Sequence, residues 1–131
     1  MTPDKLKQRT KQFSLRAIHV VESLPKTLTA DVLGRQLLRS ATSVGANYRS
    51  ACRARSKADF VSKVGIAIEE ADEALYWLEL LVEARLLPEQ RLAALLAEGN
   101  EIVAILTASS QTAKRNLRRS ISNQKSKISN T

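Results

Sequence analysis

Apolar residues recur at helical spacing through four long segments, and this pattern limits the fold more than any other feature of the chain. Each segment places its apolar side chains three, four or seven residues apart, on one helix face. The segments are residues 3–24, 29–55, 56–85 and 88 onward. Pro3 and Pro88 suit the first turn of a helix, and Pro25 ends the helical pattern of the first segment. The hydroxyl groups of Thr29 and Ser56 can cap the second and third segments. The sequence therefore predicts four amphipathic helices.

Short connections make neighbouring helices antiparallel, so the predicted fold is an all-α, up-down-up-down four-helix bundle. Composition agrees, because 44% of the 131 residues are hydrophobic but only 4% are aromatic, which suits aliphatic helix packing. We expect the bundle to occupy residues 1–119, and residues 120–131, rich in Ser, Asn and Lys, to form a disordered basic tail. Two helical hairpins exchanged between subunits would produce much the same pattern, and this alternative stays open.

Basic and acidic residues are segregated along the chain. The first 58 residues hold 12 basic and 3 acidic side chains, residues 59–101 hold 3 basic and 10 acidic ones, and the remainder holds 6 basic and none acidic. The formal net charge of +8 attracts polyanions, of which nucleic acid is the obvious candidate. The opposite signs of the second and third segments also allow contacts between subunits.

Four arginines of the second segment share one helix face, opposite its apolar side chains. They lie within about 80° of one another and extend over about 27 Å, which is long enough to follow several phosphates of a nucleic acid backbone. We predict nucleic-acid contacts by these arginines and by four cations near the C-terminus. The predicted contact residues are Arg35, Arg39, Arg49, Arg53, Lys114, Arg115, Arg118 and Arg119. A solvated helix face, with a solubilising tail, is the simpler alternative.

Acidic residues of the third segment offer the arginines a different partner. Glu70 and Glu73 flank Trp77, and both Trp77 and Leu81 are placed at the edge of the apolar stripe rather than within it. These four residues would form a subunit interface if the carboxylates received the arginines of another chain. Such a contact joins two different surfaces, and it closes into a ring or continues as a filament.

Side chains suited to catalysis are scarce. His19 is the only histidine and Cys52 the only cysteine, too few for a zinc site or a disulfide, and a Cys-His pair would require these two residues to meet. The glycines lie apart inside predicted helices and form no phosphate-binding loop. We therefore expect no enzyme activity, no metal and no cofactor. The chain shows neither a signal segment nor an apolar run of about 20 residues, so we expect a cytoplasmic protein outside membranes.

Two stretches of the chain resemble a known family. Residues 39–47 read Arg-Ser-Ala-Thr-Ser-Val-Gly-Ala-Asn, and residues 55–60 read Arg-Ser-Lys-Ala-Asp-Phe, with Glu73 further on. They are similar to the bacterial four helix bundle protein family. This family includes proteins encoded within intervening sequences of large-subunit ribosomal RNA, and it is related to the accessory variability determinant of diversity-generating retroelements. The resemblance covers roughly residues 13–108.

The resemblance implies a four-helix bundle that assembles into a homopentameric, barrel-like ring, with a basic surface that binds nucleic acid in some relatives. For the retroelement relative it also implies a reverse transcriptase as a partner. The chain departs from the family at residues 50–51, with Ser-Ala in place of Glu-Gly, and at residues 69–70, with Glu-Glu in place of Gly-Ser. The first hypothesis is a non-catalytic oligomer that binds RNA or DNA through phosphates, with RNA preferred. The second is an oligomeric protein-interaction scaffold whose arginines are used in subunit contacts.

Overall fold

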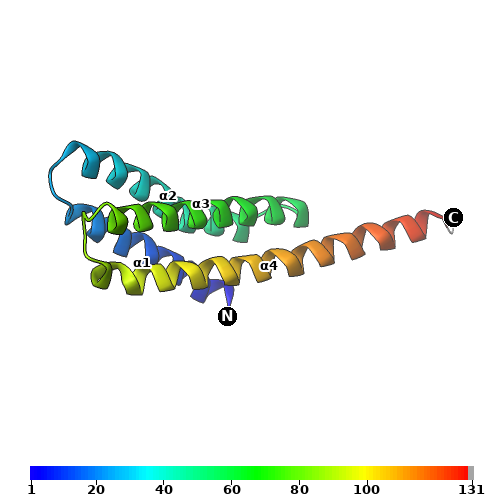
Figure 1. Cartoon of the computed structure of the whole chain (residues 1–131). Helices are drawn as coiled ribbons and strands as arrows, with labels where there is room; N and C mark the ends of the chain where they lie inside the picture. The colour runs from blue at the N-terminus through cyan, green and yellow to red at the C-terminus, as the bar shows by residue number, and fades with distance from the viewer. Residues whose placement is uncertain (130–131) are drawn as a thin grey trace.

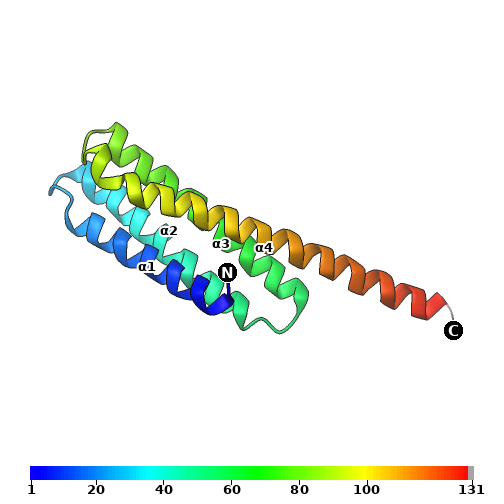
Figure 2. The same ribbon diagram turned by 90° about the horizontal axis from the view of Figure 1, so that it is seen from below.

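Four helices lie side by side in a computed structural model that describes residues 1–129. The helices are α1 (Pro3–Glu22), α2 (Leu28–Cys52), α3 (Lys57–Glu83) and α4 (Glu89–Ser129). Short turns join them, so sequence neighbours run antiparallel, and α4 projects well beyond the other three helices (Figure 1, Figure 2). No strand occurs in the described part of the chain. The predicted all-α four-helix bundle is confirmed.

Hydroxyl side chains cap the first three helices. Thr2 and Ser56 begin α1 and α3, and each accepts a hydrogen bond from the backbone N–H three residues later. The predicted cap of α2 at Thr29 is wrong, because Thr27 accepts the hydrogen bond from the N–H of Ala30 at 3.2 Å. The first three helices also end two or three residues before their predicted ends, since apolar residues of the turns continue the helical pattern.

The core lies mainly where α3 packs against both α2 and α4, and α1 completes the bundle against α2. The largest fully buried apolar side chains are Phe13, Leu37, Val44, Val64, Leu78, Leu81, Leu92, Ile102 and Leu106. Leu81 is 0% exposed, so its predicted place at the edge of the core and in a subunit interface is wrong. Because α3 is covered on two sides, it buries a wider arc than its apolar stripe indicates.

Polar contacts connect α1 to α4, the two neighbouring helices that contact each other least. The Arg9 guanidinium donates from Nε and Nη2 to the two carboxylate oxygens of Glu98 at 2.8 and 2.7 Å. It also donates to the carboxylate of Glu101. The hydrogen bonds from Arg9 lower the pKa of Glu98, although partial burial acts in the opposite direction. A bidentate pair of this kind fixes how the two helices lie against each other.

The C-terminal end of α4 differs from the predicted disordered tail. The helix continues through residue 129, and the side chains of residues 121–128 are all exposed. No glycine or proline occurs between residues 100 and 129, so no residue interrupts the backbone hydrogen bonds of the helix. Residues 130 and 131, also part of the predicted tail, lie outside the described residues. We call residues 111–129 the C-terminal arm.

Among residues 1–129, α4 alone contains a stretch long and apolar enough to cross a membrane by length and composition. Core helices of bundles pass the same test. The apolar side chains Leu92, Leu95, Ile102 and Leu106 are buried against the other helices, and this core role accounts for the composition of α4.

Candidate nucleic-acid interface

The four arginines predicted as a stripe all lie exposed on the outer face of α2 or at its C-cap. They are Arg35, Arg39, Arg49 and Arg53. Arg35 donates from Nε to Asp31, one turn earlier on α2, at 3.1 Å, and Arg39 is held by carboxylates of α3. Arg49 and Arg53 form no ion pair with any residue that the structure describes. The stripe is therefore neutralised in its first half and unpaired in its second.

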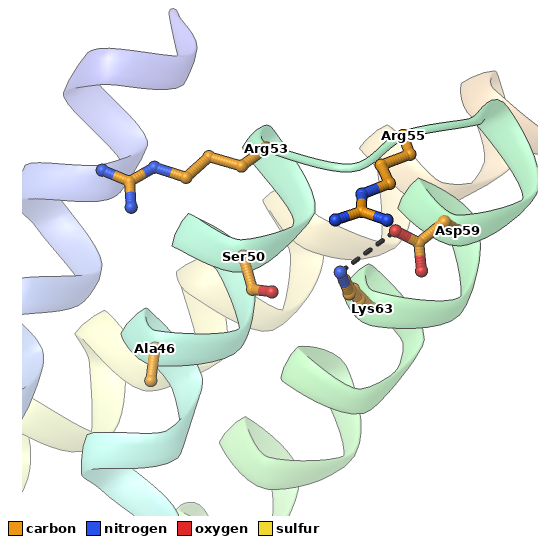
Figure 3. A pocket seen from close by; sticks show the side chains of 6 residues that line it. All are labelled: Ala46, Ser50, Arg53, Arg55, Asp59 and Lys63. Carbon is orange, nitrogen blue, oxygen red and sulfur yellow. Dashed lines mark hydrogen bonds and ion pairs between the residues drawn. The ribbon is translucent and has the colours of Figure 1, made fainter.

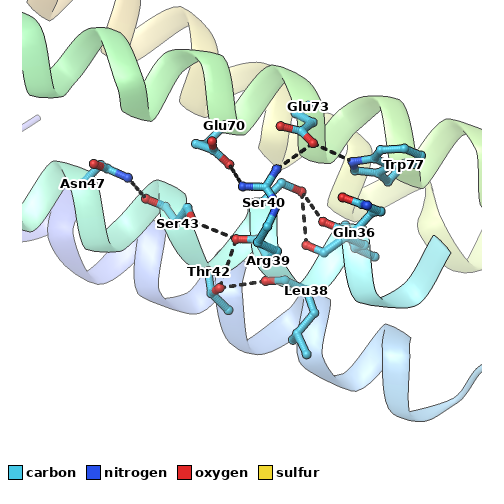
Figure 4. A network of polar contacts seen from close by, with 11 residues as sticks. Gln36, Leu38, Arg39, Ser40, Thr42, Ser43, Asn47, Glu70, Glu73 and Trp77 are labelled. Atoms are coloured by element: carbon cyan, nitrogen blue, oxygen red, sulfur yellow. Dashed lines mark hydrogen bonds and ion pairs between the residues drawn. The ribbon is translucent and has the colours of Figure 1, made fainter. Parts of the chain in front are cut away.

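Arg39 is the centre of a network within one chain (Figure 4). Its Nη1 donates to Glu70 at 3.1 Å and its Nη2 to Glu73 at 2.6 Å. The indole N–H of Trp77 donates to the same Glu73 oxygen at 3.2 Å. Both hydrogen bonds lower the pKa of Glu73, and the one from Arg39 has the larger effect. Three of the four residues predicted at a subunit interface thus belong to a hydrogen-bond network within their own chain: Glu70 and Glu73 accept from Arg39, and Trp77 donates to Glu73.

The short turn between α2 and α3 explains this pairing. Arg39 precedes the C-cap of α2, Arg53, by the same number of residues as Glu70 follows the N-cap of α3, Ser56. Antiparallel helices joined by a short turn therefore bring Arg39 and Glu70 to the same level. Helical periodicity identifies the face on which a residue lies but not its level against the next helix, so the sequence suggested a partner in another subunit.

Basic residues gather where α2 turns into α3, around a surface pocket. Its lining residues are Ala46, Ser50, Arg53, Arg55, Asp59 and Lys63. Figure 3 shows the charged groups of Arg55 and Lys63 converging beside Asp59, while Arg53 points away from them. Arg49 lies one turn before Arg53 on the same face of α2. We call Arg49, Arg53, Arg55 and Lys63 the basic corner.

Electrostatics at the basic corner favour an anion. The Lys63 ammonium donates to Asp59 at 3.0 Å, and this hydrogen bond lowers the pKa of the Asp59 carboxyl. None of the three arginines of the corner forms an ion pair within residues 1–129. The N-terminus of α3 at Ser56 adds the partial positive charge of a helix dipole. Four cations therefore accompany a single carboxylate.

Two members of the corner were missed by sequence reasoning. Arg55 lies in the turn and Lys63 on α3, so neither belongs to the helix face on which the predicted arginines were grouped. A usable signal was present in the sequence, where Arg53, Arg55 and Lys57 surround the cap residue of a helix. The short turn before Ser56 keeps these residues at the same end of the bundle, whatever their helix faces are.

The predicted C-terminal cations lie on the arm and are all exposed. They are Lys114, Arg115, Arg118 and Arg119. The Lys57 ammonium donates to the Ser120 hydroxyl at 3.4 Å, which connects the start of α3 to the arm. The structure thus brings the C-terminal cations to the end of the bundle that carries the basic corner. Arg35 and Arg39 lie further along α2, away from that end.

Reactive side chains are dispersed in the described part of the chain. No three His, Cys, Asp or Glu side chains of residues 1–129 are placed to hold a metal ion. Cys52 is half-buried, and burial together with a hydrogen bond to Cys52 raises the pKa of the Tyr48 hydroxyl. The arrangement of charge, rather than reactive chemistry, defines the candidate site.

The fold and the site define a class: a small helical bundle with strongly segregated surface charge. Residues 4–108 match the family model of the 23S rRNA-intervening sequence protein. The chain belongs to this family, and the resemblance seen in the sequence is confirmed. Curated proteins include none that matches the chain. The whole C-terminal arm, with its cations, lies beyond the matched residues.

The fold is also seen in a solved structure of a related protein. It is a crystal structure of a protein of unknown function from the S23 ribosomal protein family of Bacteroides thetaiotaomicron. The two chains are 33% identical with a TM-score of 0.79, and the match covers 85% of this chain and 99% of that one. The similarity therefore extends over nearly the whole relative but not over the whole of this chain.

Proposed function

We propose that this protein is a non-catalytic, oligomeric nucleic-acid-binding bundle that contacts phosphates through the basic corner. The accumulation of unpaired arginines beside one surface pocket, at the start of α3, carries this proposal. The planar guanidinium group donates two parallel hydrogen bonds to a phosphate, and the N–H groups of a helix N-terminus favour anions. The exposed cations of the arm extend this basic surface beyond the bundle.

Phosphate contacts predict how binding should behave. Each neutralised phosphate releases counterions, so the logarithm of affinity should fall linearly with the logarithm of salt concentration. Such contacts carry little sequence information, and with only 4% aromatic residues the chain offers few rings for base stacking. We expect weak sequence selectivity. RNA is the preferred nucleic acid, because the family is described by an intervening sequence of ribosomal RNA.

The oligomeric part of the proposal is supported by the family resemblance, which implies a pentameric ring. A protein-interaction scaffold is the second candidate function. It is favoured by Tyr76, which is 54% exposed among carboxylates of α3 and resembles the aromatic anchors of protein interfaces. Its partner would be another protein, for which the reverse transcriptase of the retroelement relative is the precedent.

Fluorescence anisotropy of labelled RNA and DNA across a salt series tests the nucleic-acid proposal. Reversing two charges at the corner, Arg53→Glu with Arg55→Glu, should weaken binding at least about tenfold and reduce the salt slope by about 2. A matched control, Lys26→Glu with Arg35→Glu, makes the same charge change towards the other end of the bundle. It should keep a slope close to that of the unmodified chain.

Three outcomes contradict the proposal. If the corner variant and the control lose the same amount of affinity, net charge alone explains the binding. If the corner variant binds normally and a chain truncated at Thr112 does not bind, the binding site for nucleic acid lies on the arm. A full chain that fails to bind at moderate salt would leave the scaffold as the better function.

A further inference from the structure

Two exposed helix faces of opposite charge lie at different places on the molecule. The acidic ridge on the outer side of α3 comprises Asp72, Tyr76, Glu79 and Glu83. The arm face comprises Lys114, Arg118, Ile121 and Lys125. In each set the four side chains fall within about 60° around the helix, and all are exposed. No described residue forms an ion pair with a carboxylate of the ridge.

Both faces repeat one spacing, with steps of four, three and four residues. With the arm antiparallel to the ridge, the facing pairs are Lys114–Glu83, Arg118–Glu79, Ile121–Tyr76 and Lys125–Asp72. A parallel arrangement would put Arg118 against Tyr76 and leave Ile121 against a carboxylate. The antiparallel register alone matches every cation with a carboxylate and apolar side chains with each other.

The arm cannot reach the acidic ridge of its own chain. The hydrogen bond between Lys57 and Ser120 places the arm beside the N-terminal end of α3, whereas the ridge occupies its C-terminal half. At 1.5 Å per residue, Lys114 lies roughly 30 Å along the bundle from the level of Glu83. The arm continues away from the bundle from there (Figure 2). A ridge that receives the arm must therefore belong to another molecule.

We propose that the C-terminal arm docks antiparallel on the acidic ridge of a second copy of this chain. The inference deepens the oligomeric part of the proposed function and does not depend on nucleic-acid binding. Because the two surfaces differ, each contact leaves one arm and one ridge open, and repetition closes a ring or extends a filament. Arg115 and Arg119 lie about 100° away from the arm face, so they stay available for phosphates.

Size-exclusion chromatography with light scattering, on the full chain at low salt, tests this docking. Lys114→Glu with Arg118→Glu should reduce the measured mass to the 14.5 kDa of one chain, and so should Glu79→Lys with Glu83→Lys. Combining all four reversals restores opposite charges across the contact and should restore the oligomer. All four side chains are exposed, and far-UV circular dichroism verifies that each variant keeps the helical fold.

Arg115→Glu with Arg119→Glu is the matched control, since it makes the same charge change on the same arm but off the docking face. This variant should assemble like the unmodified chain. Three results would overturn the docking. The first is an oligomer that persists in both double variants, and the second is a folded fourfold variant that stays monomeric. The third is an unmodified chain that is itself monomeric. RNA binding is measured separately with Arg53→Glu and Arg55→Glu, so failure of docking and failure of the proposed function are distinguishable.

Discussion

Adding one methyl group at two different glycines tests how closely the helices of this bundle approach each other. Gly99 is buried on α4, and a Cβ atom there would lie 2.6 Å from Leu75 Cδ2 on α3 and 3.2 Å from Phe13 Cε1 on α1. Gly65 lies in the interior of α3, and a Cβ atom there would meet nothing within 4 Å. Both glycines have ordinary helical backbones, so they differ in surrounding space rather than in backbone strain.

The two substitutions should change stability by different amounts. Alanine in a helix interior gains about 0.5–1 kcal/mol over glycine from backbone entropy, so Gly65→Ala should raise the free energy of unfolding by about that amount. At Gly99 the same gain is opposed by overpacking, which costs about 1–3 kcal/mol. The Leu75 methyl group can shift, but the Phe13 ring on the other side limits the movement. Gly99→Ala should therefore be less stable than Gly65→Ala by about 1–3 kcal/mol.

Urea unfolding followed by far-UV circular dichroism measures this difference. Protein and salt concentrations must be the same for both variants, because assembly would add to apparent stability by mass action. If both alanines stabilise the chain equally, the close approach of α4 to α1 and α3 at Gly99 does not exist, and the reasoning is refuted. Equal slopes of free energy against urea would show that the variants unfold from equally compact states.

Three further predictions concern the core and the carboxylates. Leu81→Ala should lower the free energy of unfolding by about 2–5 kcal/mol in urea, whereas an interface role would change only the oligomer mass. The pKa of Glu98 is lowered from 4.5 in the fold, so its contribution is complete above the unfolded-state pKa and is lost as pH falls through the folded-state value. Glu98→Gln should therefore flatten the decline of urea midpoints in acid, and an unchanged decline would contradict this. Arg39→Gln removes the main cause of the lowered Glu73 pKa, so the fluorescence of Trp77 should titrate at a higher pH than in the unmodified chain; identical titrations would contradict the network.

The fold was predictable because helical periodicity reports burial directly. Phe13, Leu37 and Leu78 belong to the apolar side chains that recur at helical spacing in the predicted segments, and all three are fully buried. The cap of α2 was misplaced because Thr27 and Thr29 are chemically alike, and only the path of the preceding turn decides between them. Leu81 was misplaced because periodicity does not reveal that α3 is covered from two sides.

The site was only partly predictable because it depends on relations between helices. The arginine face of α2 follows from spacing within one helix. The capture of Arg39 by Glu70 and Glu73 depends on the level of α3 against α2, which the turn sets. The pocket formed with Arg55 and Lys63 likewise joins a turn to the next helix. To predict contacts of this kind, one must know which residues of the two antiparallel helices lie at the same level. This requires the helix bounds to within one or two residues.

The carboxylates of α3 lie on two sides of the helix, and this division connects the proposed assembly to the proposed binding. On the side facing α2, Glu70 and Glu73 neutralise Arg39, which removes that arginine from competition for phosphates. On the outer side, the acidic ridge stays open for the arm of a second copy in the proposed assembly. Docking would neutralise the arm face but leave the basic corner of every subunit exposed. An oligomer would then present one corner per subunit, and a nucleic acid that spans two corners would bind more tightly than a short one, because the second contact is intramolecular.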